Sequence, residues 1–379
     1  MKARLGDYIK EYSVKNKNDE DIPVYSVTNT QGFCRDYFGK EVASKDKTTY
    51  KIVPKGYFAY NPSRINVGSV DWQKNEERVI VSPLYNVFSV SAELDQQFLY
   101  YYLKSDVTLH YIKAIATGSV RDNLKLNMLY EFPINIPSLG EQKEIVYKLD
   151  KLKRIISLKE SELEKFDELI KARFVELFGT YPANEKGWAT GTIRDLVTEV
   201  RYGSSRKAAD GDSGKYPYLR MNNITYSGEL DLTDTKTIDI PEDELPKCTV
   251  RKGDILFNRT NSKELVGKTC VYDRDGMMVL AGFVVRVRLN DRALPEFVSA
   301  FMNTDFSKQM LLGMCKAAIG QANINAQELQ NIGIYIPPID IQRDFVSFKQ
   351  QVDKSKVAVQ KSLDEAQLLF DSLMQKYFG

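Results

Sequence analysis

The chain has 379 residues, 43% of them apolar and 27% charged, and its 53 basic and 51 acidic groups leave a net charge of +2. This composition is that of an ordinary soluble protein with room for two separate cores. No apolar run reaches the roughly 18 residues that a membrane span needs, and no signal sequence opens the chain, so we expect a cytoplasmic protein that does not bind membranes.

The chain repeats itself. Adding 200 to a residue number between 123 and 179 gives its counterpart between 323 and 379, and 11 of these 57 aligned positions are identical. Composition alone predicts roughly three. Further upstream the offset falls to 199, 197 and then 188, as loop insertions and deletions would cause. The pattern predicts a domain duplication in which each repeat has a variable globular part followed by a tail of about 40 residues.

Each globular part is predicted to mix short strands with helices. Residues 51–60 and 249–257 each indicate a strand, a Lys-Gly turn and a second strand. Further apolar or alternating runs predict strands at residues 79–81, 85–90 and 283–289, and helices are expected near residues 95–104 and 295–302.

The tails are predicted to be long helices. Alternating steps of three and four place their apolar residues on one stripe, which is the pattern of a coiled coil. A proline-bearing strand end precedes each helix, and glycines end them at Gly179 and Gly379. From residue 141 to 178 the first helix would be ~57 Å long. The stripe is Ile145, Leu149, Leu152, Ile156, Leu163, Phe166, Ile170 and Leu177, interrupted at Lys159 and Arg173, and then Phe345, Val352, Val359, Leu363, Ala366, Phe370, Leu373 and Tyr377.

These elements predict an α+β fold. Two similar mixed α/β domains would be separated by two long antiparallel coiled-coil helices, which gives a pseudo-twofold molecule. The expected boundaries are residues 1–140 for the first domain, 141–179 for the first helix, 180–340 for the second domain with a linker at 180–187, and 341–379 for the second helix.

The sequence lacks the signatures of catalysis. A methyltransferase would carry a glycine-rich cofactor loop, yet the chain contains no G-x-G, and the segment from Asn61 to Arg64 matches only the first two residues of the Asn-Pro-Pro-aromatic box. Residues 262–269 lack the first glycine of a phosphate loop, and no serine lies in a G-x-S-x-G elbow. We therefore expect a protein that is not an enzyme and binds no cofactor.

Histidine and cysteine also argue against a metal site. The single histidine, His110, stands among apolar residues and is expected to be a packed side chain rather than a base. The four cysteines show no metal-binding or disulfide spacing, so we expect most of them to be small core residues. They are Cys34, Cys248, Cys270 and Cys315.

Polar turns are the candidate functional sites. Arginine pairs with guanine and asparagine or glutamine with adenine in the major groove, while lysine, serine and threonine hold phosphates. The same residue types populate ordinary solvated loops, and no segment of the chain is broadly basic. In the first repeat the candidates are Asn29, Thr30, Gln31, Asn61, Ser63, Arg64 and Arg121. In the second they are Arg201, Tyr202, Ser204, Ser205, Arg206, Lys207, Arg220, Asn222, Asn223, Arg259, Asn261, Lys263 and Lys268.

The order of short motifs along the whole chain resembles the specificity subunit of type I restriction-modification enzymes. The most specific part is an I-x-I-P-x4-Q motif that occurs twice, at residues 134–142 and 334–342, each time before a heptad helix. The remaining matches are Leu5-Gly-Asp7, Val53-Pro-Lys-Gly56, Leu177-Phe-Gly179, Trp188, Ile193-x-Asp195, Tyr218-Leu-Arg-Met221 and Lys252-Gly-Asp-Ile-Leu256.

This resemblance implies two target recognition domains that each read one half of a split site on double-stranded DNA, with the helices as a ruler between them. It also implies docking of two methyltransferase (modification) subunits and of restriction motor-nuclease subunits. S-adenosylmethionine, ATP and Mg would bind on those partners. Two alternatives remain open: a coiled-coil scaffold that binds no DNA, and the specificity half of another type of restriction system.

The two repeats depart from each other in their turns. The first has Lys55-Gly56-Tyr57 where the second has Lys252-Gly253-Asp254, and the polar turns differ throughout. We interpret these differences as different half-site sequences, so the recognised site is expected to be asymmetric.

Overall fold

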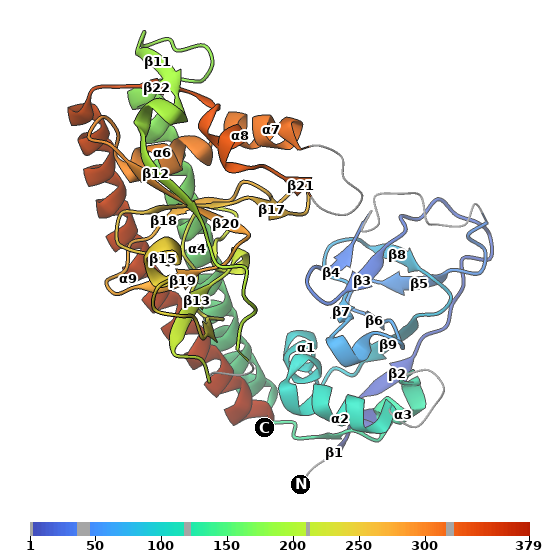
Figure 1. The fold of residues 1–379 in the computed structure, drawn as a ribbon. Coiled ribbons are helices and arrows are strands. Elements are labelled where there is room, and N and C mark those ends of the chain that lie inside the picture. The colour runs from blue at the N-terminus through green and yellow to red at the C-terminus, as the bar shows by residue number, and fades with distance from the viewer. Residues whose placement is uncertain (1–2, 36–45, 117–122, 210–212, 316–321) are drawn as a thin grey trace. The chain divides into compact units, whose positions relative to one another are not determined.

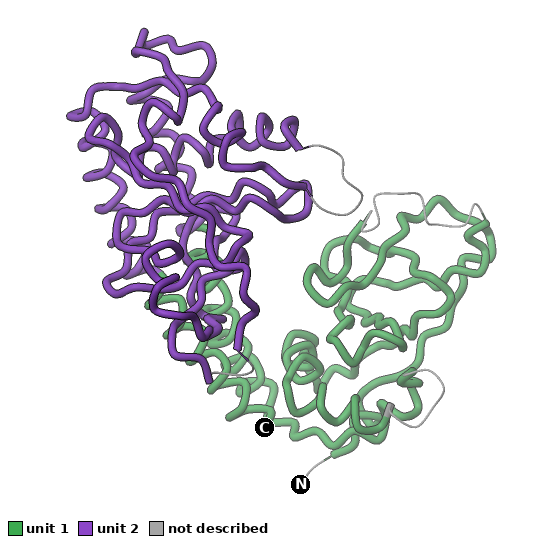
Figure 2. The backbone as a smooth tube through the Cα atoms, in the orientation of Figure 1, with its two compact units in different colours: residues 1–161, 360–379 green, residues 162–359 purple. Residues whose placement is uncertain are grey.

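The protein divides into two compact units. The computed structural model describes residues 3–35, 46–116, 123–209, 213–315 and 322–379 (Figure 1). Unit 1 consists of Met1–Ser161 with Gln360–Gly379, and unit 2 of Glu162–Val359 (Figure 2). The division passes through both long helices, so each unit contains one globular part and one half of each helix.

Unit 1 is built around an antiparallel four-stranded sheet. Its strand order is β2 (Ile9–Glu11), β9 (Asn86–Val90), β6 (Phe58–Tyr60) and β7 (Val70–Trp72). Two-stranded ladders join β3 (Ser26–Thr28) to β4 (Gly32–Cys34), β5 (Lys51–Pro54) to β8 (Arg78–Val81), and β1 (Ala3–Arg4) to β10 (Pro133–Ile134). The helices are α1 (Gln96–Lys104), α2 (Asp106–Ala116) and α3 (Leu126–Tyr130), with 3₁₀ turns η1 (Leu5–Asp7) and η2 (Ile65–Val67).

Unit 2 repeats this sheet, and three of its four strands are longer than their counterparts. The order is β12 (Val197–Tyr202), β20 (Val284–Leu289), β16 (Ile255–Asn258) and β18 (Thr269–Val271). A second sheet has the order β14 (Lys236–Ile238), β13 (Tyr216–Leu219), β19 (Met278–Leu280) and β15 (Thr249–Val250). Short ladders pair β11 (Ala189–Thr192) with β22 (Gly333–Ile336) and β17 (Thr260–Asn261) with β21 (Ala322–Asn323). The helices are α5 (Leu245–Cys248), α6 (Pro295–Met302), α7 (Asp305–Met314) and α8 (Ala326–Gln330), with η3 (Ile193–Leu196) and η4 (Met221–Asn223).

The tails form two helices of 40 residues each, α4 (Leu139–Phe178) and α9 (Ile339–Phe378). Every residue of the predicted apolar stripe is buried or half-buried, which confirms the heptad pattern. In unit 2, Lys356 of α9 pairs with Asp167 of α4 at 2.9 Å, and Arg173 lies over the ring of Phe348 at 5.6 Å. Because Arg173 follows Asp167 while Phe348 precedes Lys356, the two helix halves in this unit run antiparallel.

The last turn of each helix completes a globular core. Phe178 packs its ring against Phe297 and Phe345 in unit 2, with centroids 4.8 and 5.6 Å apart. Phe378 packs in the same way in unit 1, at 5.1 Å from Phe98. Phe98 is the counterpart of Phe297 in the repeat. Each long helix therefore begins on one globular part and ends inside the core of the other unit.

The glutamine of the doubled motif fastens the first turn of each helix. Gln142 is fully buried; its amide accepts from the backbone of Asp95 at 2.8 Å and donates to the carbonyls of Glu93 and Pro137, both at 2.9 Å. Gln342 makes the equivalent three bonds, to Leu294, Arg292 and Pro337. Buried polar groups need hydrogen-bond partners, and a glutamine side chain supplies both a donor and an acceptor. These hydrogen bonds explain why the motif contains a glutamine at the start of each long helix.

The predicted α+β class with two similar units and two long helices is confirmed. The predicted strands and the helices near residues 95–104 and 295–302 are also present. Helices α2 and α7 were not predicted. They begin immediately after short breaks at Ser105 and at Thr304, and Thr304 caps α7 by accepting a hydrogen bond from the backbone of Ser307.

One packing prediction was wrong. His110 is exposed on α2, and a ring nitrogen lies 2.7 Å from the carbonyl oxygen of Asp106 one turn earlier. The apolar contact of this helix is made by Ile112, which is fully buried. Three of the four cysteines are buried and Cys34 is half-buried, all as free thiols.

The described residues contain neither a membrane-spanning helix nor a cluster of metal-binding side chains. None of the described helices combines the length and apolarity needed to cross a membrane. Within the same residues, no group of three or more His, Cys, Asp and Glu side chains is placed to hold a metal ion.

Candidate nucleic-acid interface

The first predicted turn of unit 1, residues 29–31, is the tip of the β3–β4 hairpin. Asn29, Thr30 and Gln31 are exposed. Asp71 accepts from the backbone of Phe33 at 3.2 Å, and Lys104 donates to the carbonyl of Asn29 at 2.8 Å. The tip therefore presents three polar side chains on a backbone that is held from both sides.

A glycine makes this close approach possible. Gly32 follows the tip with a φ of +63°, and a Cβ atom there would lie 1.9 Å from the carboxylate of Asp71. Only glycine fits both the left-handed backbone and the contact. Replacing Gly32 would separate the hairpin from the carboxylate that orients it.

The second predicted turn follows β6. Asn61 is half-buried, and its side-chain oxygen accepts from the backbone and the hydroxyl of Ser63 at 3.1 and 2.9 Å. This is the local bond by which asparagine stabilises a turn. Ser63 and Arg64 are exposed. Arg121 lies outside the described residues.

Lys104, which the sequence analysis did not select, connects the two turns. Besides its bond to Asn29, its side chain lies against Gly68 at the end of the second turn, where a Cβ would be 3.4 Å from Cδ. Burial lowers the pKa of Lys104 to about 8; Asp71 opposes the shift, while Lys153 and Lys74 add to it. The sequence repeat could have pointed to Lys104, because this lysine is aligned with the neutral Asn303 and therefore differs between the two repeats.

Three of the predicted arginines in unit 2 are paired with carboxylates. Arg206 makes a two-pronged contact with Glu244 at 2.7 and 3.2 Å. Arg220 contacts Asp234 at 2.8 Å, and Arg201 contacts Glu199 at 3.1 Å. Exposed ion pairs of this kind are typically worth less than about 1 kcal/mol. They orient the guanidinium groups and reduce the positive charge that those groups offer to a ligand.

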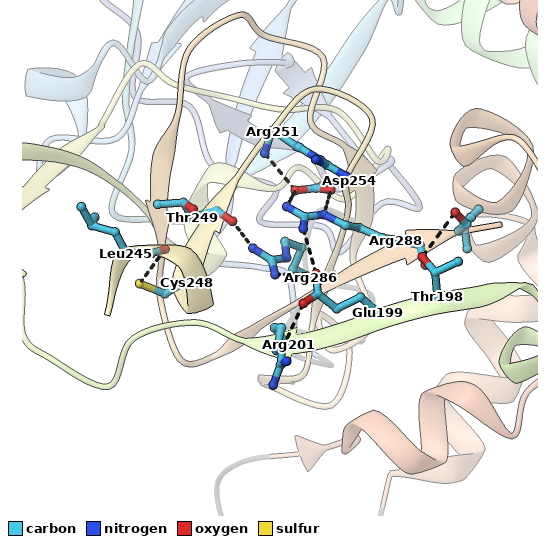
Figure 3. A network of polar contacts seen from close by, with 11 residues as sticks. Thr198, Glu199, Arg201, Leu245, Cys248, Thr249, Arg251, Asp254, Arg286 and Arg288 are labelled. Atoms are coloured by element: carbon cyan, nitrogen blue, oxygen red, sulfur yellow. Dashed lines mark hydrogen bonds and ion pairs between the residues drawn. The ribbon is translucent and has the colours of Figure 1, made fainter. Parts of the chain in front are cut away.

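Glu199, which is half-buried, belongs to a larger network that also contains buried groups (Figure 3). Besides Arg201, it accepts from Arg286 at 2.9 Å and from Arg288 at 2.8 Å. Arg288 also binds both oxygens of the buried Asp254, at 2.7 and 3.3 Å. The side chain of Arg286 is only 2% exposed. This network fixes the strand β12 that carries Arg201 and Tyr202.

Arg259 is the predicted arginine of unit 2 that has no carboxylate partner among the described residues. Its guanidinium carbon lies 5.0 Å from the ring centroid of Tyr202, whose hydroxyl accepts from the backbone of Ala326 at 3.0 Å. The backbone of Arg259 is held between Phe283 and Ile324, at 3.0 and 2.9 Å. Arg259 is therefore oriented by an aromatic ring rather than by a carboxylate, which leaves its positive charge unpaired by an acid of the described residues.

Three predicted contact residues are engaged within the fold. Asn223 is 2% exposed and uses its side chain to bond the backbone of Arg220, Asp231 and Asp234. Ser204 is buried and accepts from the backbone of Arg206. Lys268 is half-buried, donates to the carbonyl of Met221 at 2.9 Å, and has its pKa lowered by burial. They were selected because turn-forming residues and DNA-reading residues are the same types.

The remaining predicted residues of unit 2 lie at or near the surface. The backbone N–H of the fully buried Asn258 donates to the carbonyl of Lys268, and the side chain of Lys268 donates to the carbonyl of Met221. The segment that carries Arg259 therefore lies next to the turn that carries Arg220. Among the described residues, hydrogen bonds do not join all of these candidates into one cluster. Ser205, Lys207, Asn222 and Lys263 are exposed, and Asn261 is half-buried.

The fold defines a class: a duplicated α+β protein whose two sheet domains are each mounted on halves of two long helices. A family model for the type I restriction modification DNA specificity domain matches the chain twice, at residues 4–166 and 185–366. The chain belongs to this family, which confirms the resemblance carried by its motifs.

Individual relatives agree. The chain is 22% identical over 387 residues to the type I restriction enzyme EcoKI specificity subunit of Escherichia coli (strain K12), covering 97% of this chain and 83% of that protein. It is 23% identical over 389 residues to the StySPI specificity subunit of Salmonella potsdam, with the same two coverages.

Solved structures share the fold. A chain from a structure of complex assembly and conformational transition of the type I R-M system superposes with a TM-score of 0.61 at 18% identity, covering 100% of this chain and 97% of that one. The type I restriction-modification system S subunit from M. genitalium gives 0.56 at 16% identity, covering 100% and 96%. At these identities the likeness concerns the fold.

Proposed function

We propose that the chain is the DNA specificity subunit of a type I restriction-modification complex and that it reads a bipartite, asymmetric site, one half with each unit. The observation that carries the proposal is the contrast within the repeat. The helix-fastening glutamines Gln142 and Gln342 make the same bonds, whereas the exposed side chains of the polar turns differ: Lys104 holds the turn at Asn29 in unit 1, and Arg259 stacks on Tyr202 in unit 2. Two recognition domains that bind different half-sites need the same scaffold but different side chains at the positions that contact bases.

In this proposal the chain itself catalyses nothing and holds no cofactor. S-adenosylmethionine, ATP and Mg would bind to two modification subunits and to the motor-nuclease subunits. The absence of a G-x-G loop from the sequence supports this division. Exposed apolar side chains on the long helices support protein docking, because large apolar groups in water favour contact with a partner. They are Leu139, Tyr147, Leu158, Leu368 and Leu369 in unit 1 and Leu169, Val175 and Val357 in unit 2.

Methylome sequencing of a host that carries the gene with its modification subunit tests the proposal. The expected result is an adenine methylation motif with two different halves and a fixed gap. Exchanging residues 187–337 for another such domain should change one half only. A palindromic motif, or a motif unchanged by the exchange, would contradict the asymmetric reading.

The helices are proposed to set the gap between the halves. Removing one heptad from α4 and the matching heptad from α9 would shorten the pair by about 10 Å, which is roughly three base pairs. The expected result is a shorter gap in the methylated motif or no methylation at all. An unchanged gap would contradict the ruler.

A further inference from the structure

Three lysines surround one aromatic ring in unit 1. The ammonium groups of Lys74, Lys153 and Lys104 lie 4.9, 5.4 and 5.5 Å from the ring centroid of Tyr100. They come from three elements: Lys74 follows β7, Lys104 ends α1 with Tyr100, and Lys153 lies on α4. The packing of the fold thus concentrates positive charge from distant parts of the chain.

Their positions are held by neighbouring rings and backbone. Lys74 also lies 5.2 Å from the ring of Trp72, whose indole N–H donates to Gln97 at 3.1 Å. Lys104 donates to the carbonyl of Asn29. Aromatic faces attract ammonium groups, so the lysine stems are oriented before any ligand arrives.

The carboxylates near the ring do not balance the three lysines. Asp71 lies 3.2 Å from Lys74 and also accepts from the backbone of Phe33. Asp150 accepts from Tyr101 at 2.5 Å and from Gln97 at 3.3 Å. Among the described residues, neither Lys104 nor Lys153 has a carboxylate within ion-pair distance. Three lysines thus face the two carboxylates of Asp71 and Asp150, so the net charge is +1, and an anion placed among the lysines would relieve their mutual repulsion.

The lysines are peculiar to unit 1. The sheet register and the repeat align Lys74 with Asp273, Tyr100 with Ser299, Lys104 with Asn303 and Lys153 with Asp353. Asn303 donates to the carbonyls of Thr269 and Ser299 instead. Because the second unit keeps the same sheet without any of these lysines, the fold does not need them.

We propose that Lys74, Lys104 and Lys153 form a binding site for a backbone phosphate of DNA, beside the hairpin tip at residues 29–31. The inference rests on the proposed function. Lys104 touches the tip directly, so a phosphate held here would fix the register of Asn29, Thr30 and Gln31 on the bases of one half-site. The site takes a phosphodiester rather than a base edge, because point-charge lysines around a ring offer no directional pattern to read.

The test measures DNA affinity of the full chain assembled with its modification subunits, as a function of salt. The doubly substituted Lys74→Gln/Lys153→Gln chain is expected to bind roughly tenfold more weakly near 0.1 M salt, with the log–log salt slope reduced by about one. Its preference for the correct half-site over an altered one should stay unchanged. Lys74→Arg/Lys153→Arg keeps the charges and should restore the slope.

Lys148→Gln is the control on the same helix, because it removes one lysine charge from another face of α4, where Lys148 is 52% exposed. It should leave affinity and slope unchanged. Equal thermal unfolding midpoints for all variants establish that they are folded.

Three outcomes would overturn the site: an unchanged slope in the double variant, an equal loss in the control, or a change confined to half-site preference. A free phosphate site would appear as thermal stabilisation of the wild type by inorganic phosphate that the double variant loses while its DNA slope is unchanged. That result too would overturn the proposal. Failure of the proposed function is distinct, because the wild-type complex itself would then show no preference for any bipartite DNA site.

Discussion

The two units fill one equivalent position in opposite ways. Tyr57 and Asp254 each follow the Lys-Gly turn before the central strand. In unit 1 the ring of Tyr57 packs edge-on against Tyr12 at 4.9 Å. In unit 2 the carboxylate of Asp254 instead binds Arg288, and Arg201 occupies the place of Tyr12 beside Glu199.

This difference shows how a shared frame accepts different interiors. An aromatic pair contributes roughly 0.5–1.5 kcal/mol beyond the burial of its area. A buried ionic network roughly breaks even against an apolar group of similar size, although losing one member leaves a charge unpaired. The sheet therefore tolerates either solution when all members change together, and it should not tolerate a change in one member alone.

The largest expected effect comes from breaking the ionic interior. Asp254→Ala should destabilise unit 2 by about 3–5 kcal/mol, because it leaves the guanidinium of Arg288 with Glu199 as its remaining acid partner. Amide hydrogen exchange measured by mass spectrometry should show faster exchange in β16 and β20. Tyr57→Phe in unit 1 keeps the ring and should cost less than about 1 kcal/mol. A loss of that small size for Asp254→Ala would mean that the network is effectively solvated.

Substituting the motif glutamine should destabilise both units by a similar amount. Gln142→Ala and Gln342→Ala each remove three hydrogen bonds between a fully buried side chain and the backbone, so each should cost about 1–3 kcal/mol in its own unit. Urea unfolding of the two variants measures this. Gln350→Ala, at an exposed position on α9, should change the stability by less than about 0.5 kcal/mol. Clearly unequal losses of unfolding free energy for the two variants would show that the glutamine does not have the same structural role in the two units.

Substituting different candidate DNA-binding arginines should weaken DNA binding by different amounts. Arg259→Ala should cost about 1–3 kcal/mol in binding DNA with the correct second half-site, because its guanidinium is stacked and free of carboxylates. Arg206→Ala should cost less, since Arg206 must first be separated from Glu244. Competition between DNAs that differ only in one half-site measures both. Equal losses on unrelated DNA would assign Arg259 to phosphate binding instead.

The smallest expected effect is on pH dependence. The pKa of Lys104 is about 8, so its ammonium group is present at pH 7 and is lost as the pH rises through 8. A bound phosphate favours the ammonium, so DNA binding should weaken up to roughly tenfold between pH 7 and 9. The charged groups facing Lys104 are Asp71, Lys74 and Lys153. Tyr100 stays neutral in this range because burial raises its pKa to about 12.

Lys104→Arg should abolish this drop, since arginine stays charged; a drop that persists in the variant belongs to another group. Stability has the opposite sign. An unfolded lysine has a pKa of 10.5, above the folded value, so the unfolded chain binds more protons between pH 8 and 10.5. The free energy of unfolding from this group should therefore rise with pH over that window, which separates lost binding from lost folding.

The regular parts of the fold were predictable because they depend on local patterns. The heptad stripe predicted α4 and α9, and the doubled glutamine motif marked where each helix begins. The strand around Val79 and the helix near Phe98 were visible as apolar runs. The outward position of His110 was not, because neighbouring apolar residues do not say which face of a helix is buried.

The candidate site was less predictable, for a physical reason. Arginine, asparagine and lysine in a turn look alike whether they are exposed or engaged. The side chain of Asn223 is hydrogen-bonded to backbone groups up to 11 residues away, and that of Arg206 is paired with the carboxylate of Glu244, 38 residues away. Contacts at that separation leave no signature in a single sequence.

The sequence by itself determined the duplication, the long helices and the family, because these follow from periodic spacing and repeated motifs. Only the tertiary structure decided which polar residues are left for a ligand. It paired Arg201, Arg206 and Arg220 with carboxylates, left Arg259 stacked on Tyr202, and brought Lys74, Lys104 and Lys153 around Tyr100. Charge balance is a property of neighbours in space, and chain order does not encode it directly.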